Sequence, residues 1–486
     1  MNPLDQLQTP LVSALQICAN RANAAFHTPG HKRGQGISDQ HCALFGTKVF
    51  RADLPELPEL DNLFAPEGVI LAAQQLAAEA FGAEQTWFLA NGSTCGIEAA
   101  ILATCGPSDQ LILPRNVHVS AISGLILSGA TPIYLPAGYG QEWDMPLAVT
   151  PDDVMMALDA HPEAKAVLVV SPTYYGICSD LGAIAQLTHA HNIPLIVDEA
   201  HAPHFTFHPD FPPSALKAGA DIVIQSAHKV LSAFTQAALL HTQGDRIDRN
   251  RIIQSLQLTQ STSPSYLLLG SLDAARHQMA TEGFSNMART LDLADRASRE
   301  LRKLKGLKVG RWGDRTRITV EVSGLGLTGF QADELLHERF GVTAELPALR
   351  HLMFLITLGN THADIDRLIE GFKGLCELHP PINVKLGSSK SFDLPISQFS
   401  ARQTPRQAFF APKIALPFSQ ACGHICAETI CPYPPGIPVL LPGEPVTTDA
   451  LSYLKTIQAA GGIITGCRDP DLKTILVIQS APAAPC

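Results

Sequence analysis

Two residues that could do chemistry follow two short apolar segments of the chain. The segment 193–197 leads into Asp198, and the segment 221–225 leads toward Lys229. Both segments are rich in β-branched residues, as is typical of buried parallel strands, and such strands present their last residues to a ligand at the carboxyl edge of the sheet. The acid and the lysine stand 31 positions apart (229 minus 198), which leaves room for a helix between the strands.

An aspartate and a lysine at such an edge are the two groups that pyridoxal phosphate needs from a protein. The carboxylate keeps the pyridine nitrogen protonated, so that the ring accepts electrons from the substrate, and the lysine amine bonds to the aldehyde carbon of the cofactor. Either residue alone would be an ordinary polar side chain at a strand end. The combination predicts a pyridoxal-phosphate enzyme in which Asp198 and Lys229 are catalytic.

Two further segments suit a cofactor that carries a phosphate and an aromatic ring. Asn91-Gly-Ser-Thr94 links a strand-like segment to a helix, so backbone N–H groups and the hydroxyls of Ser93 and Thr94 would face a phosphate dianion. His118 follows another strand-like segment, where an imidazole could stack on the pyridine ring. Taken singly, these would be a helix cap and a loop histidine. Their order, upstream of the acid and the lysine, favours the cofactor.

Two groups of histidines, cysteines and acids could instead hold a metal ion. In the first group no helix would bring the histidines onto one face. The second group has the spacing Cys-x-His-x-Cys, which lacks the Cys-x-x-Cys turn that wraps zinc and puts alternate residues on one face of a strand. We therefore expect no metal. The two groups are Asp198, His201, His204 and His208, and Cys422, His424, Cys426 and Cys431.

The composition indicates a well-packed α/β protein and argues against a nucleic-acid-binding or membrane protein. Of the 486 residues, 46% are hydrophobic and 16% are charged, and the formal net charge is -10. A chain without a basic run is not expected to bind nucleic acid. The N-terminus lacks the pattern of a secretory signal, and no apolar stretch is long enough to span a bilayer. We expect a cytoplasmic protein whose 11 cysteines are reduced.

Strand-like and helix-like segments alternate from about residue 67 to 275, which predicts a mainly parallel sheet covered by helices. A long helix over about 284–305 opens a smaller α+β domain. The predicted divisions are an N-terminal helix and loop segment at 1–60, a large domain at 61–283, a small α+β domain at 284–375, a linker at 376–404 and a C-terminal α+β domain at 405–486.

A set of motifs between about residue 20 and 470 is specific enough to suggest a family. The motifs are His27-Thr-Pro-Gly-His-Lys-Arg-Gly34, Asp53-Leu-Pro-Glu-Leu57, Leu60-Asp-Asn-Leu63, Asn91-Gly-Ser-Thr94, Ser171-Pro-Thr-Tyr-Tyr-Gly-Ile-Cys178, Asp198-Glu-Ala-His201, Ser226-Ala-His-Lys229, Gln260-Ser-Thr-Ser-Pro-Ser-Tyr266, Pro432-Tyr-Pro-Pro-Gly-Ile-Pro438 and Pro442-Gly-Glu444. Together they resemble the bacterial ornithine/lysine/arginine decarboxylases, in the short form without a wing domain. This resemblance implies a fold-type-I pyridoxal-phosphate enzyme with an aspartate aminotransferase-like large domain.

The resemblance also assigns roles to matching positions. The implied cofactor-binding residues are Ser93, Thr94, His118, Asp198, Ala200, His201, Ser226, His228, Lys229 and Ser261, of which Asp198, His228 and Lys229 are also catalytic. The hydroxyls of Ser93, Thr94 and Ser226, with His228, would hold the phosphate. The segment 261–263 would reach the phosphate of a neighbouring subunit, which implies a homodimer or a multiple of dimers with shared active sites.

The implied reaction is decarboxylation of arginine, lysine or ornithine to CO2 and agmatine, cadaverine or putrescine, in polyamine biosynthesis. A cationic substrate needs an anion at the far end of its pocket. We expect Glu428, before the proline-rich turn, to supply it; otherwise the N-terminal acids Asp53, Glu56 and Glu59 are the candidates. The chain has Val119 where the family commonly has a lysine after the stacking histidine, so any contact of that lysine is absent.

Two other functions fit the same fold. One is an aminotransferase, in which Arg350 of the small domain would clamp the substrate carboxylate. The other is a catalytically lapsed regulatory or binding protein, which the intact Asp198 and Lys229 argue against.

Overall fold

The structure is a computed structural model, which describes residues 4–136, 138–382, 403–433 and 436–479. The chain forms two compact units, each made of two chain segments. Unit 1 comprises Met1–Thr104 and Pro194–Ala288, and unit 2 comprises Cys105–Ile193 and Arg289–Cys486. Most of the predicted linker at 376–404 lies outside the described residues, and its first three residues end helix α12. The predicted domain limits stay predictions.

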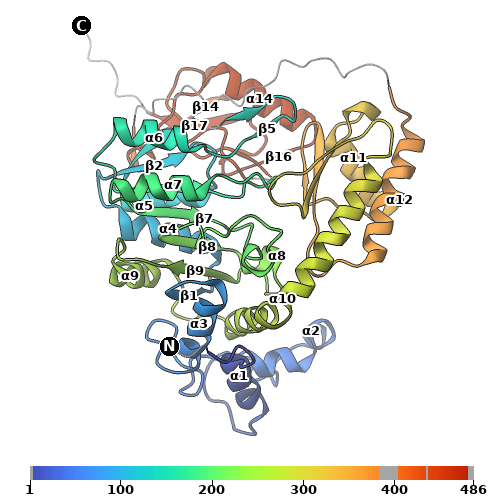
Figure 1. Cartoon of the computed structure of the whole chain (residues 1–486). Coiled ribbons are helices and arrows are strands. Elements are labelled where there is room, and N and C mark those ends of the chain that lie inside the picture. Colours follow the sequence, from blue (N-terminus) through green and yellow to red (C-terminus); the bar gives the residue numbers. More distant parts are fainter. Residues whose placement is uncertain (1–3, 137, 383–402, 434–435, 480–486) are drawn as a thin grey trace. The chain divides into compact units, whose positions relative to one another are not determined.

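In unit 1, four strands lie in the order β1-β9-β8-β7 (Figure 1). β7 and β8 are parallel, whereas β9 runs antiparallel to both β8 and β1. Every residue of β7, β8 and β9 is buried, which explains why these strands read as almost continuous apolar runs. The elements of unit 1 are α1 (Pro10–Asn20), α2 (Asp39–Ala52), α3 (Val69–Phe81), β1 (Gln85–Leu89), α4 (Gly92–Thr104), β7 (Leu195–Asp198), β8 (Ile222–Gln225), α8 (Ala227–Val230), β9 (Ala238–Thr242), α9 (Arg249–Thr259) and the start of α10 (Tyr266–Leu301).

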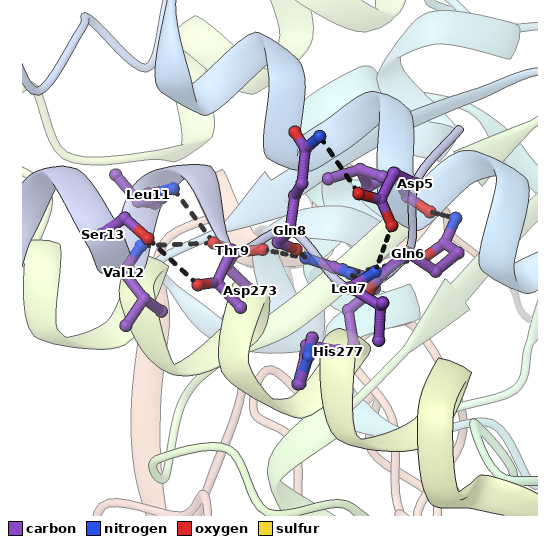
Figure 2. A network of polar contacts seen from close by, with 12 residues as sticks. Asp5, Gln6, Leu7, Gln8, Thr9, Leu11, Val12, Ser13, Asp273 and His277 are labelled. Atoms are coloured by element: carbon purple, nitrogen blue, oxygen red, sulfur yellow. Dashed lines mark hydrogen bonds and ion pairs between the residues drawn. The ribbon is translucent and has the colours of Figure 1, made fainter.

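The first helix is attached to α10 by a buried aspartate (Figure 2). Thr9, the N-cap of α1, makes no side-chain capping bond. Instead, Oδ2 of Asp273 accepts hydrogen bonds from the backbone N–H groups of Leu11 and Val12, at 3.0 and 3.2 Å. The guanidinium of Arg276 pairs with the same carboxylate at 2.5 Å. Unpaired N–H groups at a helix start are thereby satisfied, so that α1 has a fixed place in unit 1.

In unit 2, three parallel strands lie in the order β6-β2-β3, and a separate antiparallel sheet has the order β10-β11-β13-β12. One face of the antiparallel sheet shares a core with α11 and α12. The elements are β2 (Gln110–Pro114), α5 (Val119–Ser128), β3 (Thr131–Leu135), β4 (Tyr139–Gly140), β5 (Met145–Pro146), α6 (Pro151–Ala160), β6 (Ala166–Val170), α7 (Leu181–Ala190), β10 (Lys308–Gly310), β11 (Arg317–Glu321), α11 (Gly329–Leu335), β12 (Leu346–Pro347), β13 (His351–Leu355) and α12 (His362–Leu378).

The C-terminal part of unit 2 has its own small core around α14. A buried ion pair ties it to the loop after β2: Nε and Nη2 of Arg115 donate to the two carboxylate oxygens of Glu444 at 2.8 and 2.7 Å. Both side chains are 1% exposed. The elements of this part are α13 (Pro405–Phe410), β14 (Lys413–Pro417), β15 (Cys431–Tyr433), α14 (Thr448–Ala459), β16 (Ile463–Thr465) and β17 (Thr474–Ile478).

The predicted α/β class with mainly parallel strands is confirmed, and strands and helices alternate over the expected range of about 67–275. The N-terminal segment contains a second helix, α2, beyond the one expected, and a later helix begins earlier than expected. The helix expected from about residue 284 begins at Tyr266, because no proline interrupts the chain between Pro264 and Leu301. Within the described ranges no helix is long and apolar enough to cross a membrane.

Candidate functional site

The acid ends one of two neighbouring parallel strands of unit 1, and the lysine is on the short helix that follows the other. Asp198 is the last residue of β7 and lies opposite Ile224 of β8. The next backbone N–H, that of Glu199, donates to the carbonyl of Ile224 at 2.9 Å. Because β8 then passes through Ser226 into helix α8, the carboxyl edge of the sheet presents Asp198 beside the turn that carries Lys229.

Lys229 contacts the other end of the Asp-Glu-Ala-His motif. Its Nζ lies 3.3 Å from Nε2 of His201, within hydrogen-bonding distance, and both side chains have little exposure. Oδ1 of Asp198 accepts a hydrogen bond from the backbone N–H of Ala200 at 3.1 Å. The structure therefore brings the lysine, His201 and the motif of Asp198 to one place.

The segment proposed to hold the phosphate lies beside the same turn. Helix α4 has 13 residues and begins at Gly92, so that its free N–H groups surround Ser93. The hydroxyl of Ser226 donates to Oγ of Ser93 at 2.8 Å. A Cβ on Gly96 would approach Ile224 of β8 to 3.0 Å, which shows how closely α4 packs on the strand that leads to Lys229. Thr94, in the same turn, is exposed.

Three amides, to which no role was assigned from the sequence, fix the loop before α4. Ala90 donates its N–H to Oε1 of Gln260 at 2.8 Å and accepts at its carbonyl from Nε2 of Gln236, also at 2.8 Å. Oδ1 of Asn91 accepts from the backbone N–H of Ser261 at 3.3 Å. Asn91 and Gln260 each begin one of the motifs found in the sequence, whereas Gln236 lies in none of them. Ser261 thus lies beside the Asn91 loop of its own chain.

His228 is held as a neutral imidazole. Its backbone N–H and its Nδ1 both contact the carbonyl of Ala237, at 3.3 and 3.1 Å. Burial lowers the pKa of His228 below its ordinary value, with a smaller contribution from the charge of Lys229. Because a ring nitrogen must donate to a carbonyl, Nδ1 carries the proton, and Nε2 is left as an acceptor.

A chain of buried hydrogen bonds begins at Glu199, the residue after Asp198. Glu199 accepts from the backbone N–H of Ala215 and from Nε2 of Gln225, each at 2.7 Å. Gln225 in turn contacts Nε2 of His241 at 3.1 Å, whose Nδ1 contacts the hydroxyl of Thr86 at 2.7 Å. Burial raises the pKa of Glu199 to about 8 and lowers that of His241 to about 3. These hydrogen bonds join strands β8, β9 and β1 to the residue next to Asp198.

His118 belongs to unit 2, so its predicted stacking on the cofactor stays a prediction. It caps α5, where its Nδ1 accepts from the backbone N–H of Ser120 at 3.2 Å. With Val119 and other residues of α5 it lines a cavity of about 480 Å³, closed on the other side by residues of the C-terminal part, including Tyr433 and Thr465. The valine in place of the usual family lysine therefore makes one wall of this cavity apolar.

Two side chains that were predicted to contact the substrate, those of Glu428 and Arg350, have partners within the protein. The two oxygens of Glu428 accept from the backbone N–H groups of Leu476 and Arg468, each at 2.9 Å, and the side chain is buried. This gives Glu428 a structural task, and its contact with a substrate stays a prediction. Nη2 of Arg350 pairs with Glu321 at 2.5 Å, and the role of Arg350 in clamping a substrate carboxylate stays a prediction.

Sequence comparison decides the family. Residues 9–321 match the family model of the Orn/Lys/Arg decarboxylase major domain, and residues 393–468 match that of the Orn/Lys/Arg decarboxylase C-terminal domain. This chain is a member of the Orn/Lys/Arg decarboxylase family. The decarboxylase is 37% identical over 490 residues to a protein named arginine decarboxylase from Bacillus subtilis (strain 168), with 99% of this chain and 100% of the relative covered. The predicted family is confirmed.

Solved structures share the fold of the decarboxylase. The lysine decarboxylase LdcF of Francisella novicida has a TM-score of 0.82 at 22% identity and covers 97% of this chain and 81% of its own. A more distant structure, described as SPT with PLP, has a TM-score of 0.51 at 15% identity and covers 64% and 76%. The predicted fold-type-I architecture is thereby confirmed.

Proposed function

We propose that this decarboxylase removes the carboxylate of arginine, using pyridoxal phosphate bound to Lys229, and releases CO2 and agmatine. The Lys229–His201 contact at 3.3 Å, beside the strand end that carries Asp198, is the observation that carries the proposal. Arginine is preferred over lysine and ornithine because the 37% identical relative is named arginine decarboxylase, whereas proteins named lysine decarboxylase are 24% identical or less. The amine product would feed polyamine synthesis.

The residues of unit 1 fit the cofactor. Ser93 and Ser226, joined at 2.8 Å, stand at the start of a 13-residue helix, where a phosphate dianion is stabilised by free N–H groups. Asp198 is 7% exposed, and a buried carboxylate needs a cationic partner such as a pyridinium nitrogen. Thr94, Ala200 and, from unit 2, His118 are the further cofactor contacts that we propose.

When bound, the cofactor supplies an electron sink that weakens the bond between Cα and the carboxylate. Asp198 would keep the ring nitrogen protonated. Lys229 would hold the cofactor covalently and yield this place to the substrate amine.

A proton replaces CO2 at Cα, and the catalytic residues Lys229 and His228 are the candidate donors. His228 is neutral, since its pKa is lowered, and its one ring proton is engaged with the carbonyl of Ala237. The amine of Lys229 can carry a proton and has Nε2 of His201 at 3.3 Å. We therefore propose Lys229 as the donor, with His201 orienting its amine.

The proposal includes a homodimer or a multiple of dimers. All three residues 261–263 are exposed on this chain, as a segment that serves a partner's phosphate would require. Helix α2 has no buried residue, and its apolar side chains Leu44 and Phe45 are 74% and 52% exposed. An ordered helix with an uncovered apolar face is typical of an interface between subunits.

A product assay separates the proposal from its rivals. The protein, loaded with pyridoxal phosphate, is incubated with arginine, lysine or ornithine, and CO2, amine and keto acid are measured. Equal amounts of CO2 and amine, with arginine giving the highest kcat/KM, are expected. Keto acid would instead indicate an aminotransferase, and the absence of any product would indicate a catalytically lapsed protein.

A further inference from the structure

A small cavity in unit 2 has a wall of aromatic rings with one carboxylate among them. Its volume is about 60 Å³. Since a single water needs roughly 10–15 Å³, this cavity has room for several waters or for an ammonium group on a short aliphatic stem. The carboxylate is that of Asp144, and the aromatic residues are Tyr139, Tyr175, Phe330, Tyr433 and Tyr453.

The carboxylate of Asp144 is poorly compensated. Within the described ranges its side chain accepts one hydrogen bond, from the hydroxyl of Tyr139, and pairs with no cation. The charge of the Arg350 guanidinium lowers the pKa of Asp144, but this guanidinium is already paired with Glu321 at 2.5 Å. Burial raises the pKa of Asp144 above its ordinary value. A desolvated carboxylate with a single neutral donor is stabilised by any cation that can reach it.

The aromatic wall offers the second element of a cation site. Tyr175 is 4% exposed, and its hydroxyl forms no hydrogen bond with any residue that the structure describes. Burial raises the pKa values of Tyr139, Tyr175 and Tyr453, so that these phenols are neutral and can accept hydrogen bonds. The faces of such rings attract a cation that lies over them.

We propose that this cavity binds the ammonium end of a small aliphatic amine, with Asp144 as its counter-ion. An ammonium group has three N–H donors, which match the free carboxylate oxygen of Asp144 and the phenol oxygens of the wall. The cavity belongs to unit 2, whereas Lys229 and Asp198 belong to unit 1. Amino-acid decarboxylation releases amines of this class, so the site would let the enzyme respond to its own type of product.

Calorimetric titration of the cofactor-loaded protein with n-propylammonium tests the proposal. Saturable binding is expected, and Asp144→Asn should weaken it at least tenfold, because the amide keeps the shape and removes the charge. Tyr175→Phe, which keeps the ring and removes the hydroxyl, should weaken it about threefold to tenfold. The matched control is Glu345→Gln, since Glu345 forms a similar pair with a tyrosine, Tyr174, at 2.5 Å and does not line the cavity.

Two further measurements distinguish binding in the cavity from binding at Lys229 and from a loss of folding. The visible absorption of the cofactor is followed during the titration, because an amine at Lys229 would change it and an amine in the cavity would not. Thermal melting of each variant establishes that it is folded. The proposal is overturned if the wild-type protein binds no n-propylammonium, which would mean a cavity for water only, or if folded Asp144→Asn and Tyr175→Phe bind it as tightly as the wild type does.

Discussion

At the scale of single residues, burial sets the protonation of several groups, two of them in unit 1 and one in unit 2. Glu199 is a carboxyl with a pKa raised to about 8, and His241 and His351 are imidazoles with pKa values lowered to about 3. Each stays uncharged near neutral pH because desolvation penalises its charged form. Titration of such groups makes stability depend on pH.

His351 gives the clearest pH prediction. Its two ring nitrogens form no hydrogen bond with any described residue, and burial, helped by the charge of Arg350, lowers its pKa to about 3. Between pH 6.5 and 3 the unfolded chain binds a proton here and the folded chain does not, so stability falls as the pH falls through this range. Between pH 7 and 4 the free energy of unfolding of the wild type should therefore fall by about 1–4 kcal/mol because of His351, and His351→Leu should abolish this part of the fall.

The measurement for His351 is urea unfolding at several pH values. His424→Leu, at an exposed position, is the control and should leave the pH profile unchanged. An His351→Leu profile parallel to that of the wild type would mean that His351 is protonated in the folded protein as easily as in the unfolded chain.

A substitution of Glu428 distinguishes the substrate contact predicted from the sequence from the structural role seen in its backbone hydrogen bonds. Because both carboxylate oxygens accept from backbone N–H groups, Glu428→Gln turns one acceptor into a donor and leaves a buried N–H unpaired, which costs about 1–3 kcal/mol. We expect a matching drop in the free energy of unfolding, and an unchanged KM would mean that Glu428 has this structural task alone. A KM raised roughly ten- to a hundredfold for basic substrates would instead support the substrate contact predicted from the sequence. Glu370→Gln, on an exposed face of α12, is the control.

At the scale of elements, helix α4 must lie close to the sheet to present Ser93. A Cβ on Gly96 would come within 2.7 Å of Cδ1 of Leu89 and 3.0 Å of Cγ2 of Ile224, and both side chains are fully buried. Gly96→Ala should therefore push α4 outward, lower the stability by about 1–3 kcal/mol and weaken cofactor binding.

Equilibrium dialysis against pyridoxal phosphate and thermal unfolding measure the two effects. Gly106→Ala is the matched control, because its Cβ would meet nothing closer than Oδ2 of Asp109 at 3.5 Å. Normal cofactor affinity in a destabilised Gly96→Ala protein would show that the phosphate does not depend on the position of α4.

The elements also show what the sequence could and could not predict. The strands that carry Asp198 and Lys229 were predictable, because fully buried strands leave continuous apolar runs. The order β1-β9-β8-β7 was not, since it depends on pairings between segments far apart in the chain. The bonds of Ala90 to Gln236 and Gln260 follow from that order. Nor can a sequence pattern tell whether the carboxylate of Glu428 faces a substrate or the backbone.

At the scale of the whole molecule, shared active sites predict complementation. If the serines at 261–263 serve a partner's phosphate, mixing Lys229→Ala chains with Ser261→Ala/Ser263→Ala chains should restore partial activity, because one site of each hybrid dimer is intact. Each variant alone should be nearly inactive. The bond between Ser261 and Asn91 of one chain allows the opposite outcome, in which each chain completes its own site. In that case hybrid dimers would form, as mass spectrometry can verify, without regaining activity.

Covalent attachment of the cofactor to Lys229 is the central claim, and borohydride reduction tests it most directly. Reduction fixes a pyridoxyl group on the lysine that holds the cofactor, and peptide mass spectrometry locates it. We expect the label on Lys229 in the wild-type protein, and the same label in Lys217→Ala, whose altered lysine is exposed. Lys229→Ala should carry no label and release no CO2 from arginine. A label on another lysine of the wild-type protein, or an active Lys229→Ala protein, would contradict the account.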